Sequence, residues 1–169
     1  MAKDFILSKD SAQEKLHRMA LQIAENISDD SADLILIGVG EKGAAMAKKI
    51  NTYLENYIHS PVDIMMVSLN KMRPEEVILN KDCNFDDKNI IIIDDVSNSG
   101  KTLLYALKPL LAYHPKRIQT LVMIERMHKA FPIKPDYVGL SLATTNDDHI
   151  RVEIEDGEIT GVIFDEPEK

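Results

Sequence analysis

The stretch Asn-Ile-Ile-Ile-Ile-Asp-Asp, residues 89–95, restricts most strongly what this chain can fold into. Its four consecutive isoleucines present no polar side, so they indicate a strand that is buried on both faces of its sheet. Such strands are typical of parallel sheets, in which helices cover both faces. Other short apolar runs alternate with segments of helical periodicity along the chain. The sequence therefore predicts an α/β fold with an open, doubly wound, Rossmann-like parallel sheet.

The expected elements follow from apolar periodicity and from turn residues. Ser11 and Glu14 have the spacing of a capping box for the first helix, and Pro109 should kink or shorten the last one. The sequence predicts strands at 34–38, 62–69, 90–93, 117–125 and 136–142. It predicts helices at 11–27, after the turn 39–43, and at 100–113. Residues 70–88 are expected to form a loop in which Pro74 could start one helical turn, and the chain should end in a hairpin that turns at Asp156-Gly157.

Composition bounds the class of protein. A chain of 169 residues suggests one domain. Its formal net charge of −8 argues against broad nucleic-acid binding, although a local basic patch stays open. The single cysteine, Cys83, excludes an intramolecular disulfide and a cysteine zinc cluster. With neither an apolar signal core nor a membrane-length run, the simplest expectation is a cytoplasmic protein that does not associate with membranes.

Two stretches resemble phosphate-binding motifs. Ser-Gly-Lys-Thr, residues 99–102, would need a glycine at position 95 to complete a P-loop, but an aspartate stands there and would repel a triphosphate. Gly38 to Gly43 fits the dinucleotide pattern G-x-G-x-x-G between a strand and a helix, yet the next strand ends without the acid that would hold the ribose. The second stretch therefore favours a phosphate or pyrophosphate site, and a tight turn without a ligand stays open as the alternative.

Two carboxylates, Asp94 and Asp95, follow the isoleucine run directly. Carboxylates only accept hydrogen bonds, so two of them suit a pair of vicinal hydroxyls such as those of ribose. Residues 97–102 then supply hydroxyls, a glycine and backbone N–H groups at a helix start, which suit a phosphate monoester. Together they predict a ribose 5-phosphate site. The plainer alternative is a solvated, helix-capping pair of aspartates.

The stretch IIIIDDVSNSGKT resembles the phosphoribosyl-pyrophosphate signature of the type I phosphoribosyltransferases, with Ser99 in place of the usual threonine. GVGEKG falls where that family has its pyrophosphate loop. The run ERMHKAFPIKPDYVGLSLATT, residues 125–145, is similar to one in the bifunctional pyrimidine-operon attenuator and uracil phosphoribosyltransferase proteins.

This resemblance implies a reaction and a domain plan. The reaction is transfer of 5-phosphoribosyl from phosphoribosyl pyrophosphate to a nucleobase, uracil being favoured, with release of pyrophosphate in nucleotide salvage. Mg²⁺ would arrive with the substrate, and the protein would be a homodimer or a higher homo-oligomer. The implied plan is one type I phosphoribosyltransferase domain over 1–169, with a mobile loop at 70–88 and a small hood with the C-terminal hairpin at 145–164.

The resemblance also implies roles for single residues. Asp94 and Asp95 would hold the ribose hydroxyls and could contact the magnesium. Lys42 stands where relatives commonly have arginine, and it and Arg73 are the expected catalytic cations. The remaining substrate contacts would be Gly40, Glu41 and Gly43 for pyrophosphate, Ser97, Asn98, Ser99, Gly100, Lys101 and Thr102 for the 5′-phosphate, and Tyr137 and Val138 for the base, with Glu125 and Arg126 close by.

Two other functions stay open. Glu41 beside the pyrophosphate position and a short 70–88 segment favour weak or absent catalysis, so the chain could instead be a nucleotide-binding regulator, with RNA as a less favoured partner. Six basic residues are expected to crowd into one region, as a solvated surface cluster at least as readily as an RNA face: Lys116, Arg117, Arg126, His128, Lys129 and Lys134. A dinucleotide-binding enzyme is the distant alternative.

Overall fold

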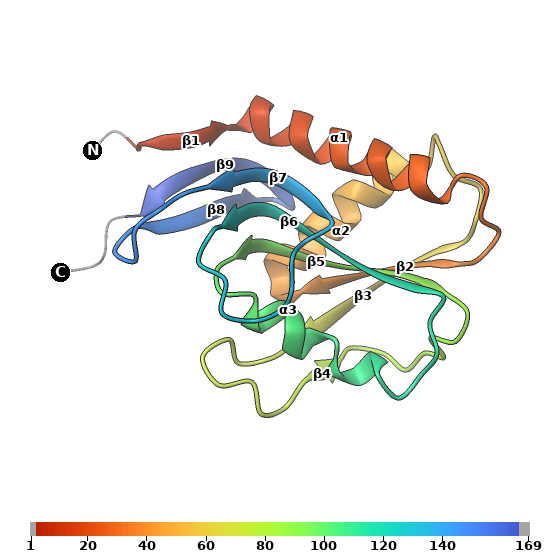
Figure 1. Ribbon diagram of the computed structural model, residues 1–169. Helices are drawn as coiled ribbons and strands as arrows, with labels where there is room; N and C mark the ends of the chain where they lie inside the picture. The colour runs from red at the N-terminus through yellow and green to blue at the C-terminus, as the bar shows by residue number, and fades with distance from the viewer. Residues whose placement is uncertain (1–2, 166–169) are drawn as a thin grey trace.

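The protein folds around a six-stranded sheet with a smaller three-stranded sheet beside it (Figure 1). The computed structural model describes residues 3–165, so both ends of the expected domain 1–169 lie outside the described part. The elements are β1 Phe5–Ser8, α1 Lys9–Ile27, β2 Leu34–Val39, α2 Gly40–Leu54, β3 Val62–Ser68, β4 Ile78–Leu79, β5 Asn89–Ser97, α3 Lys101–Ala106, a 3₁₀ turn Lys108–Leu110, β6 Arg117–Arg126, β7 Tyr137–Leu142, β8 His149–Glu155 and β9 Glu158–Asp165.

The central sheet confirms the prediction from the isoleucine run. Its strand order is β4-β3-β2-β5-β6-β7, and every neighbouring pair is parallel except β3 with β4. Strand β5 lies between β2 and β6, and Ile90 to Ile93 are all buried. A strand in that position meets side chains on both faces and other strands on both edges, which explains why its stretch from Ile90 to Ile93 is entirely apolar.

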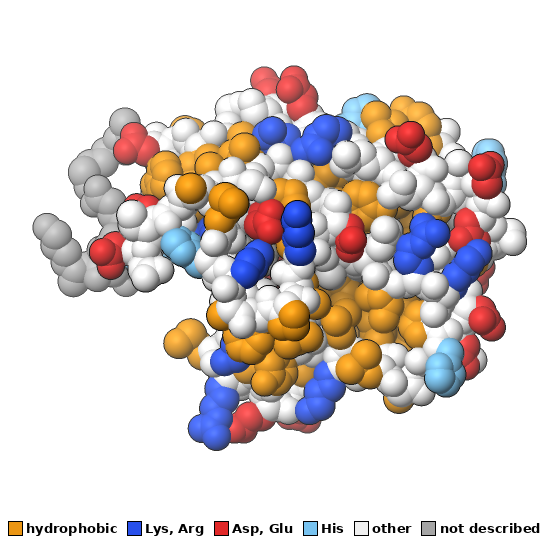
Figure 2. All heavy atoms as spheres, viewed as in Figure 1, with side chains coloured by type: hydrophobic (Ala, Val, Ile, Leu, Met, Phe, Trp, Pro, Cys, Tyr) orange, Lys and Arg blue, Asp and Glu red, His pale blue; other side chains and the backbone are white. Residues whose placement is uncertain are grey.

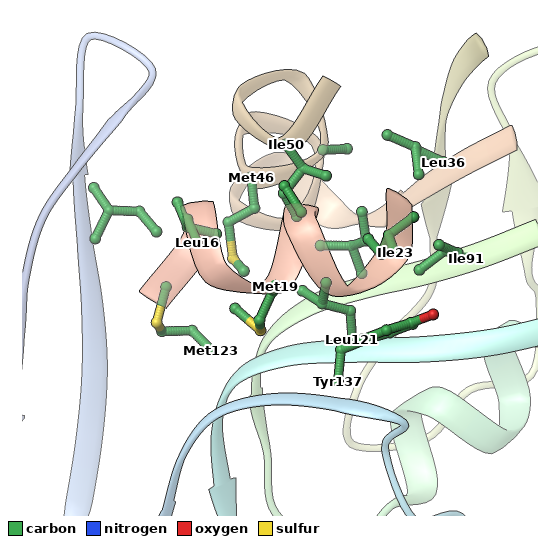
Figure 3. Close-up of a cluster of buried hydrophobic side chains, with 14 of the residues drawn as sticks. Leu16, Met19, Ile23, Leu36, Met46, Ile50, Ile91, Leu121, Met123 and Tyr137 are labelled. Atoms are coloured by element: carbon green, nitrogen blue, oxygen red, sulfur yellow. The ribbon is translucent and has the colours of Figure 1, made fainter. Parts of the chain in front are cut away.

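Two hydrophobic cores cover the two faces of this sheet. On one face, α1 and α2 bury an apolar stripe that includes Leu16, Met19 and Met46 against Leu36 and Ile91 (Figure 3). On the other face, a second core is built from α3, the 3₁₀ turn and the segment that leads into β5. The sheet is therefore covered on both sides, as the doubly wound fold requires.

Several element boundaries differ from the sequence prediction. Strand β5 does not end at Ile93 but runs through Ser97, because its parallel ladder with β6 continues from Asp94 to Ser97. Helix α1 starts at Lys9, and its N-cap is Ser8, whose Oγ accepts from the backbone N–H of Ser11 at 3.2 Å. The predicted capping box at Ser11 is therefore wrong by three residues.

The segments around α3 behave partly as expected. Helix α3 ends at Ala106 and a 3₁₀ turn carries Pro109, so the proline does shorten the helix. Residues 70–88 form an irregular connection, and no helical turn forms at Pro74. The short strand β4 within this connection pairs antiparallel with the end of β3, and the sequence did not indicate it.

The second sheet has the order β1-β9-β8. The predicted hairpin is confirmed: β8 and β9 are joined at Asp156 and Gly157, whose φ values of 50° and 78° suit a two-residue turn that matches strand twist. Strand β1 pairs antiparallel with β9 and was not predicted, since four residues carry little periodicity. Figure 1 shows this sheet beside the carboxyl ends of the central strands.

Within residues 3–165, no helix combines the length and the apolar character needed to cross a bilayer.

Candidate functional site

The centre of the site is the carboxylate pair, Asp94 and Asp95, near the end of β5. Both residues are buried, with exposed fractions of 1% and 8%. Asp94 Oδ1 accepts from the backbone N–H of Asp95 at 2.9 Å. Asp94 Oδ2 is buried and has no hydrogen-bond partner among the described residues. A buried acceptor without a partner costs free energy, so this oxygen is suited to a donor that a ligand brings.

Burial and mutual repulsion set the protonation of this pair. Burial, followed by the charge of Asp95, raises the pKa of Asp94 to about 7. Burial would also raise the pKa of Asp95, but the hydrogen bond with Asp94 and the charge of Lys71 together hold it below its ordinary value. The pair therefore keeps at least one negative charge at neutral pH, and Asp94 changes charge near that pH.

Two lysines lie within ion-pair distance of the pair. Lys71 Nζ lies 3.3 Å from Asp94 Oδ1 and 3.6 Å from Asp95 Oδ1. Lys42 Nζ, on the first turn of α2, lies 3.9 Å from Asp95 Oδ2. Burial alone would lower the pKa of Lys71, but the two carboxylate charges outweigh it and the pKa is raised. Lys42 thus lies near the carboxylate pair, where the sequence analysis expects it. Lys71 also contacts the pair, although the sequence analysis does not name it as a site residue.

A cavity of about 180 Å³ adjoins Asp94. We call its wall of residues 97–102 the phosphate cradle; Lys71 and Met72 also line the cavity. Gly100 has φ +87°, a conformation that favours glycine, and Ser99 Oγ accepts from the backbone N–H of Lys101 at 3.3 Å. The carboxylate, the hydroxyls and the lysine side chains around the cavity could bind the hydroxyls and phosphate of a sugar phosphate.

The predicted pyrophosphate loop, residues 40–43, is the first turn of α2 at the same edge of the sheet. Its glycines differ in purpose. A Cβ on Gly43 would lie 2.4 Å from Ile93 O, so this glycine is required for close packing of α2 on β5. Gly40 has φ +64° and open space around it, and Glu41 is exposed. The loop is accessible, but it does not line the cavity of the phosphate cradle.

Arg126 connects three segments at the carboxyl end of β6. Its guanidinium donates to Asn98 Oδ1 at 3.1 Å, to Thr144 Oγ1 at 2.9 Å and to Thr145 O at 2.8 Å. This fork ties the phosphate cradle to the connection between β7 and β8. Arg126 therefore lies beside the site, as predicted.

Glu125 is next to Arg126 in the same ladder. Its Oε2 accepts from Ser141 Oγ at 3.0 Å, and its Oε1 lies 3.6 Å from Lys129 Nζ. Lys129 in turn donates to Ser97 Oγ in the phosphate cradle at 2.9 Å. The predicted pair Glu125 and Arg126 thus contacts the cradle, directly or through one lysine.

Three other predicted residues lie elsewhere. Arg73 is exposed and pairs with Glu75 at 2.8 Å, so it does not reach the carboxylate pair. Tyr137 is buried under α1, and its hydroxyl bonds to Asn26 and Gln119, which leaves no free ring face for a base (Figure 3). Val138 packs on the opposite face of β7, against the second core.

The predicted basic patch does not form. Lys116 and Arg117 lie at the start of β6, where Lys116 pairs with Asp30 at 2.8 Å, whereas Arg126 lies at its end. A strand of 10 residues separates these ends by about 30 Å. On the side of the molecule that Figure 2 shows, lysine and arginine side chains lie in separate groups with acidic side chains nearby. The expectation of one crowded basic region is therefore wrong.

The sequence reasoning missed two residues of the site. Lys71 and Arg73 both follow β3 closely in the sequence, and the sequence analysis names only Arg73 as a site residue. The neighbouring residues do not indicate which of the two side chains points toward the carboxylate pair. Lys129 was assigned to the basic patch, yet it contacts Ser97. The one usable signal was position, because residues after parallel strands gather at the carboxyl edge of the sheet.

The fold and this site define a class of protein. The phosphoribosyl transferase domain family matches residues 6–156, and the chain belongs to this family. It is similar to "Bifunctional protein PyrR" of Roseiflexus sp. (strain RS-1), with 31% identity over 97% of this chain and 96% of the relative. The protein of the same name from Clostridium botulinum (strain Eklund 17B / Type B) is 30% identical over 96% and 97%.

Solved structures agree on the fold. A hypoxanthine-guanine phosphoribosyltransferase from Bacillus anthracis superposes with a TM-score of 0.71 and 25% identity, over 89% of this chain and 87% of that one. The hypoxanthine phosphoribosyltransferase of Trypanosoma cruzi gives a TM-score of 0.81 over 99% and 98%, at 16% identity. The predicted type I phosphoribosyltransferase fold is therefore confirmed.

Proposed function

We propose that the protein transfers a 5-phosphoribosyl group from phosphoribosyl pyrophosphate to a nucleobase and releases pyrophosphate, in nucleotide salvage. The observation that carries this proposal is the buried carboxylate pair, of which Asp94 lines a cavity of about 180 Å³ together with hydroxyls and lysines. The unpartnered Asp94 Oδ2 supports it, since a ribose hydroxyl supplies the missing donor.

The residue roles follow from the position of each group. Asp94 and Asp95 hold the ribose hydroxyls, and the phosphate cradle holds the 5′-phosphate. The N–H groups of residues 40–43 and the ammonium of Lys42 stabilise the departing pyrophosphate. The bond to pyrophosphate breaks ahead of attack by the base nitrogen, so the protein contributes orientation and charge stabilisation and needs no nucleophile of its own.

Magnesium fits this set of residues as a cation shared with the substrate. Among residues 3–165, no group of three or more His, Cys, Asp or Glu side chains could hold a metal ion by itself. The carboxylate pair offers hard oxygen ligands, and phosphate oxygens of the substrate would complete the shell. When bound, Mg²⁺ neutralises charge on pyrophosphate as it leaves.

Uracil is the base that we favour, because residues 125–145 are similar to a run in the bifunctional pyrimidine-operon attenuator and uracil phosphoribosyltransferase proteins. Hypoxanthine is the second candidate, since the similar solved structures are named for that base. Arg126 and Thr144, beside the cradle, are better placed to contact a base than Tyr137, whose ring is buried.

The test is a turnover screen with phosphoribosyl pyrophosphate and Mg²⁺. Uracil, orotate, hypoxanthine, guanine and xanthine are offered separately, and nucleotide formation is followed by absorbance. We expect turnover with uracil, and none when Mg²⁺ is removed by chelation. Turnover with hypoxanthine alone would keep the reaction and reassign the base.

The second candidate is a nucleotide-binding regulator without turnover. Exposed Glu41 at the pyrophosphate position favours it, because a carboxylate there opposes a polyanionic leaving group. Nucleoside monophosphate binding without turnover of any base would put this reading first. RNA is the less favoured partner, since the six cations do not form one patch.

Four further expectations belong to the same proposal: a homodimer or higher homo-oligomer, a cytoplasmic location, a mobile loop at 70–88 and a hood at 145–164. Light scattering in solution checks the first. Hydrogen exchange with and without nucleotide checks the loop, in which we expect protection to rise when ligand is bound.

A further inference from the structure

Lys71 makes contacts that the proposed reaction does not require. Its ammonium lies 3.3 Å from one oxygen of Asp94 and 3.6 Å from one oxygen of Asp95, so a single cation bridges the pair. Its side chain is 52% exposed, whereas Asp94 is almost fully buried. The lysine therefore covers the pair from the solvent side.

The backbone around Lys71 is held in place for this contact. Asn70 Oδ1 accepts from the backbone N–H of Met72 at 3.0 Å and of Arg73 at 3.3 Å, which fixes the turn that carries Lys71. Lys101 Nζ, from the phosphate cradle, donates to Met72 O at 3.1 Å. In this structure the turn is thus held by hydrogen bonds within itself and by one hydrogen bond to the phosphate cradle.

We propose that Lys71 closes the Asp94–Asp95 pair to free divalent cations, so that a cation enters this site only together with a phosphorylated ligand. The first half stands on the geometry of Lys71, and the second half rests on the proposed function.

The physical basis is competition for the same oxygens. A divalent cation binds most strongly where two carboxylates meet, and the ammonium already occupies the space between them. Its charge also repels a second cation over this short distance. A polyanionic ligand offers Lys71 phosphate oxygens in exchange, which frees the carboxylates at the moment when the cation arrives with that ligand.

Lys42 cannot replace Lys71 in this role. It approaches one oxygen of Asp95 at 3.9 Å, and Asp94 is not among its contacts. Removal of the Lys71 charge therefore leaves Asp94 with no cation within ion-pair distance among residues 3–165. Asp94 would then take up a proton more readily, so cation binding must be measured at about pH 8.5, where the carboxylate form dominates.

The experiment titrates Mn²⁺ into the ligand-free protein and follows free Mn²⁺ by electron paramagnetic resonance. We expect Lys71→Met to bind one Mn²⁺ about tenfold more tightly than wild type, because both the competing ammonium and its charge are gone. Lys71→Arg keeps the charge and should match wild type. Lys81→Met is the matched control, since Lys81 is an exposed lysine of the same connection whose partner is Asp63.

Adding Asp94→Asn to Lys71→Met should abolish the gain. The proposal is overturned if Lys71→Met binds Mn²⁺ no more tightly than wild type, or if the gain survives in the double variant. Calorimetry of wild type with phosphoribosyl pyrophosphate and Mg²⁺ is run in parallel. If wild type does not bind phosphoribosyl pyrophosphate with Mg²⁺, the proposed function is overturned, and so is the claim that a cation enters with a phosphorylated ligand. The Mn²⁺ titration would still decide whether Lys71 excludes free cations.

Discussion

Two strand-to-helix connections stand side by side at the carboxyl edge of the central sheet, and they use glycine for different purposes. In residues 38–43, Gly38 and Gly43 permit close packing: an added Cβ would lie 2.2 Å from Ala44 N and 2.4 Å from Ile93 O. In the phosphate cradle, Gly100 provides a backbone conformation with φ +87° beside a cavity. The glycine pattern alone therefore does not separate a packing role from a binding role, and only Gly100 lines the cavity beside Asp94.

The strongest test of this contrast is Gly43→Ala. Because the new methyl would overlap a backbone carbonyl, we expect a loss of about 3 kcal/mol or more in the free energy of unfolding. Gly40→Ala, in the same turn but with open space, should cost only about 1 kcal/mol from its φ of +64°. Urea unfolding of both variants measures the difference; equal losses would mean that packing does not explain Gly43.

Asp94, beside the phosphate cradle, should make the stability of the fold depend on pH. Its pKa in the folded protein, about 7, lies above its ordinary value of 3.8, so the folded state binds the proton more tightly than the unfolded chain. The associated stability is fully present below pH 3.8 and is lost as the pH rises through about 7. Asp94→Asn should flatten this fall, worth on the order of a few kcal/mol.

Urea midpoints measured between about pH 4 and pH 8 test this expectation. The pKa of Asp95 is lowered, so its contribution to the stability of the fold is present at any pH above its ordinary pKa of 3.8. That contribution is lost only as the pH falls below this value. A wild-type stability that rises through neutral pH, or an Asn variant with the same fall, would contradict the account.

Gly100→Ala should cost about 2 kcal/mol of stability, less than Gly43→Ala, because it combines an unfavourable φ with contacts of 3.3 Å and 3.4 Å to the carbonyls of Ile133 and Phe131. Unlike Gly40→Ala, it should also weaken inorganic phosphate binding, since the turn that shapes the cradle must shift. Thermal unfolding and calorimetry with phosphate separate the two effects. Unaltered phosphate affinity would remove Gly100 from the binding role.

The smallest expected effect concerns Glu41. If residues 40–43 face pyrophosphate, Glu41→Thr removes an opposing charge and should raise turnover severalfold, about 1 kcal/mol, without a change in stability. Steady-state rates with uracil give the comparison. A fast wild-type enzyme that this substitution inactivates would assign Glu41 a positive role.

Much of the fold could be predicted because its signals are local. Four isoleucines in a row between turn residues favour a buried strand, Asp156-Gly157 favours a tight turn, and Pro109 shortens a helix. The short strands β1 and β4 could not be predicted, since each forms through pairing with a distant partner rather than through its own periodicity.

The site was predictable only where the motif itself carries the chemistry. The carboxylate pair and the cradle are contiguous in sequence, and the structure brings them together. Tyr137 was assigned to the base although its hydroxyl is held by Asn26 and Gln119 from other elements, which no local pattern reveals. Lys71 contacts the carboxylate pair whereas Arg73 pairs with Glu75, and the sequence does not reveal this because side-chain direction in an irregular loop depends on distant contacts.

The most direct measurement is calorimetry of phosphoribosyl pyrophosphate with Mg²⁺ on wild type and on Asp94→Asn/Asp95→Asn, with circular dichroism to show that both are folded. Each lost charge-assisted hydrogen bond should weaken binding by about 1.5–3 kcal/mol, so the double variant, which loses at least two, should bind at least about a hundredfold more weakly. Equal affinity for wild type and the folded double variant would contradict the assignment of the ribose hydroxyls to this pair.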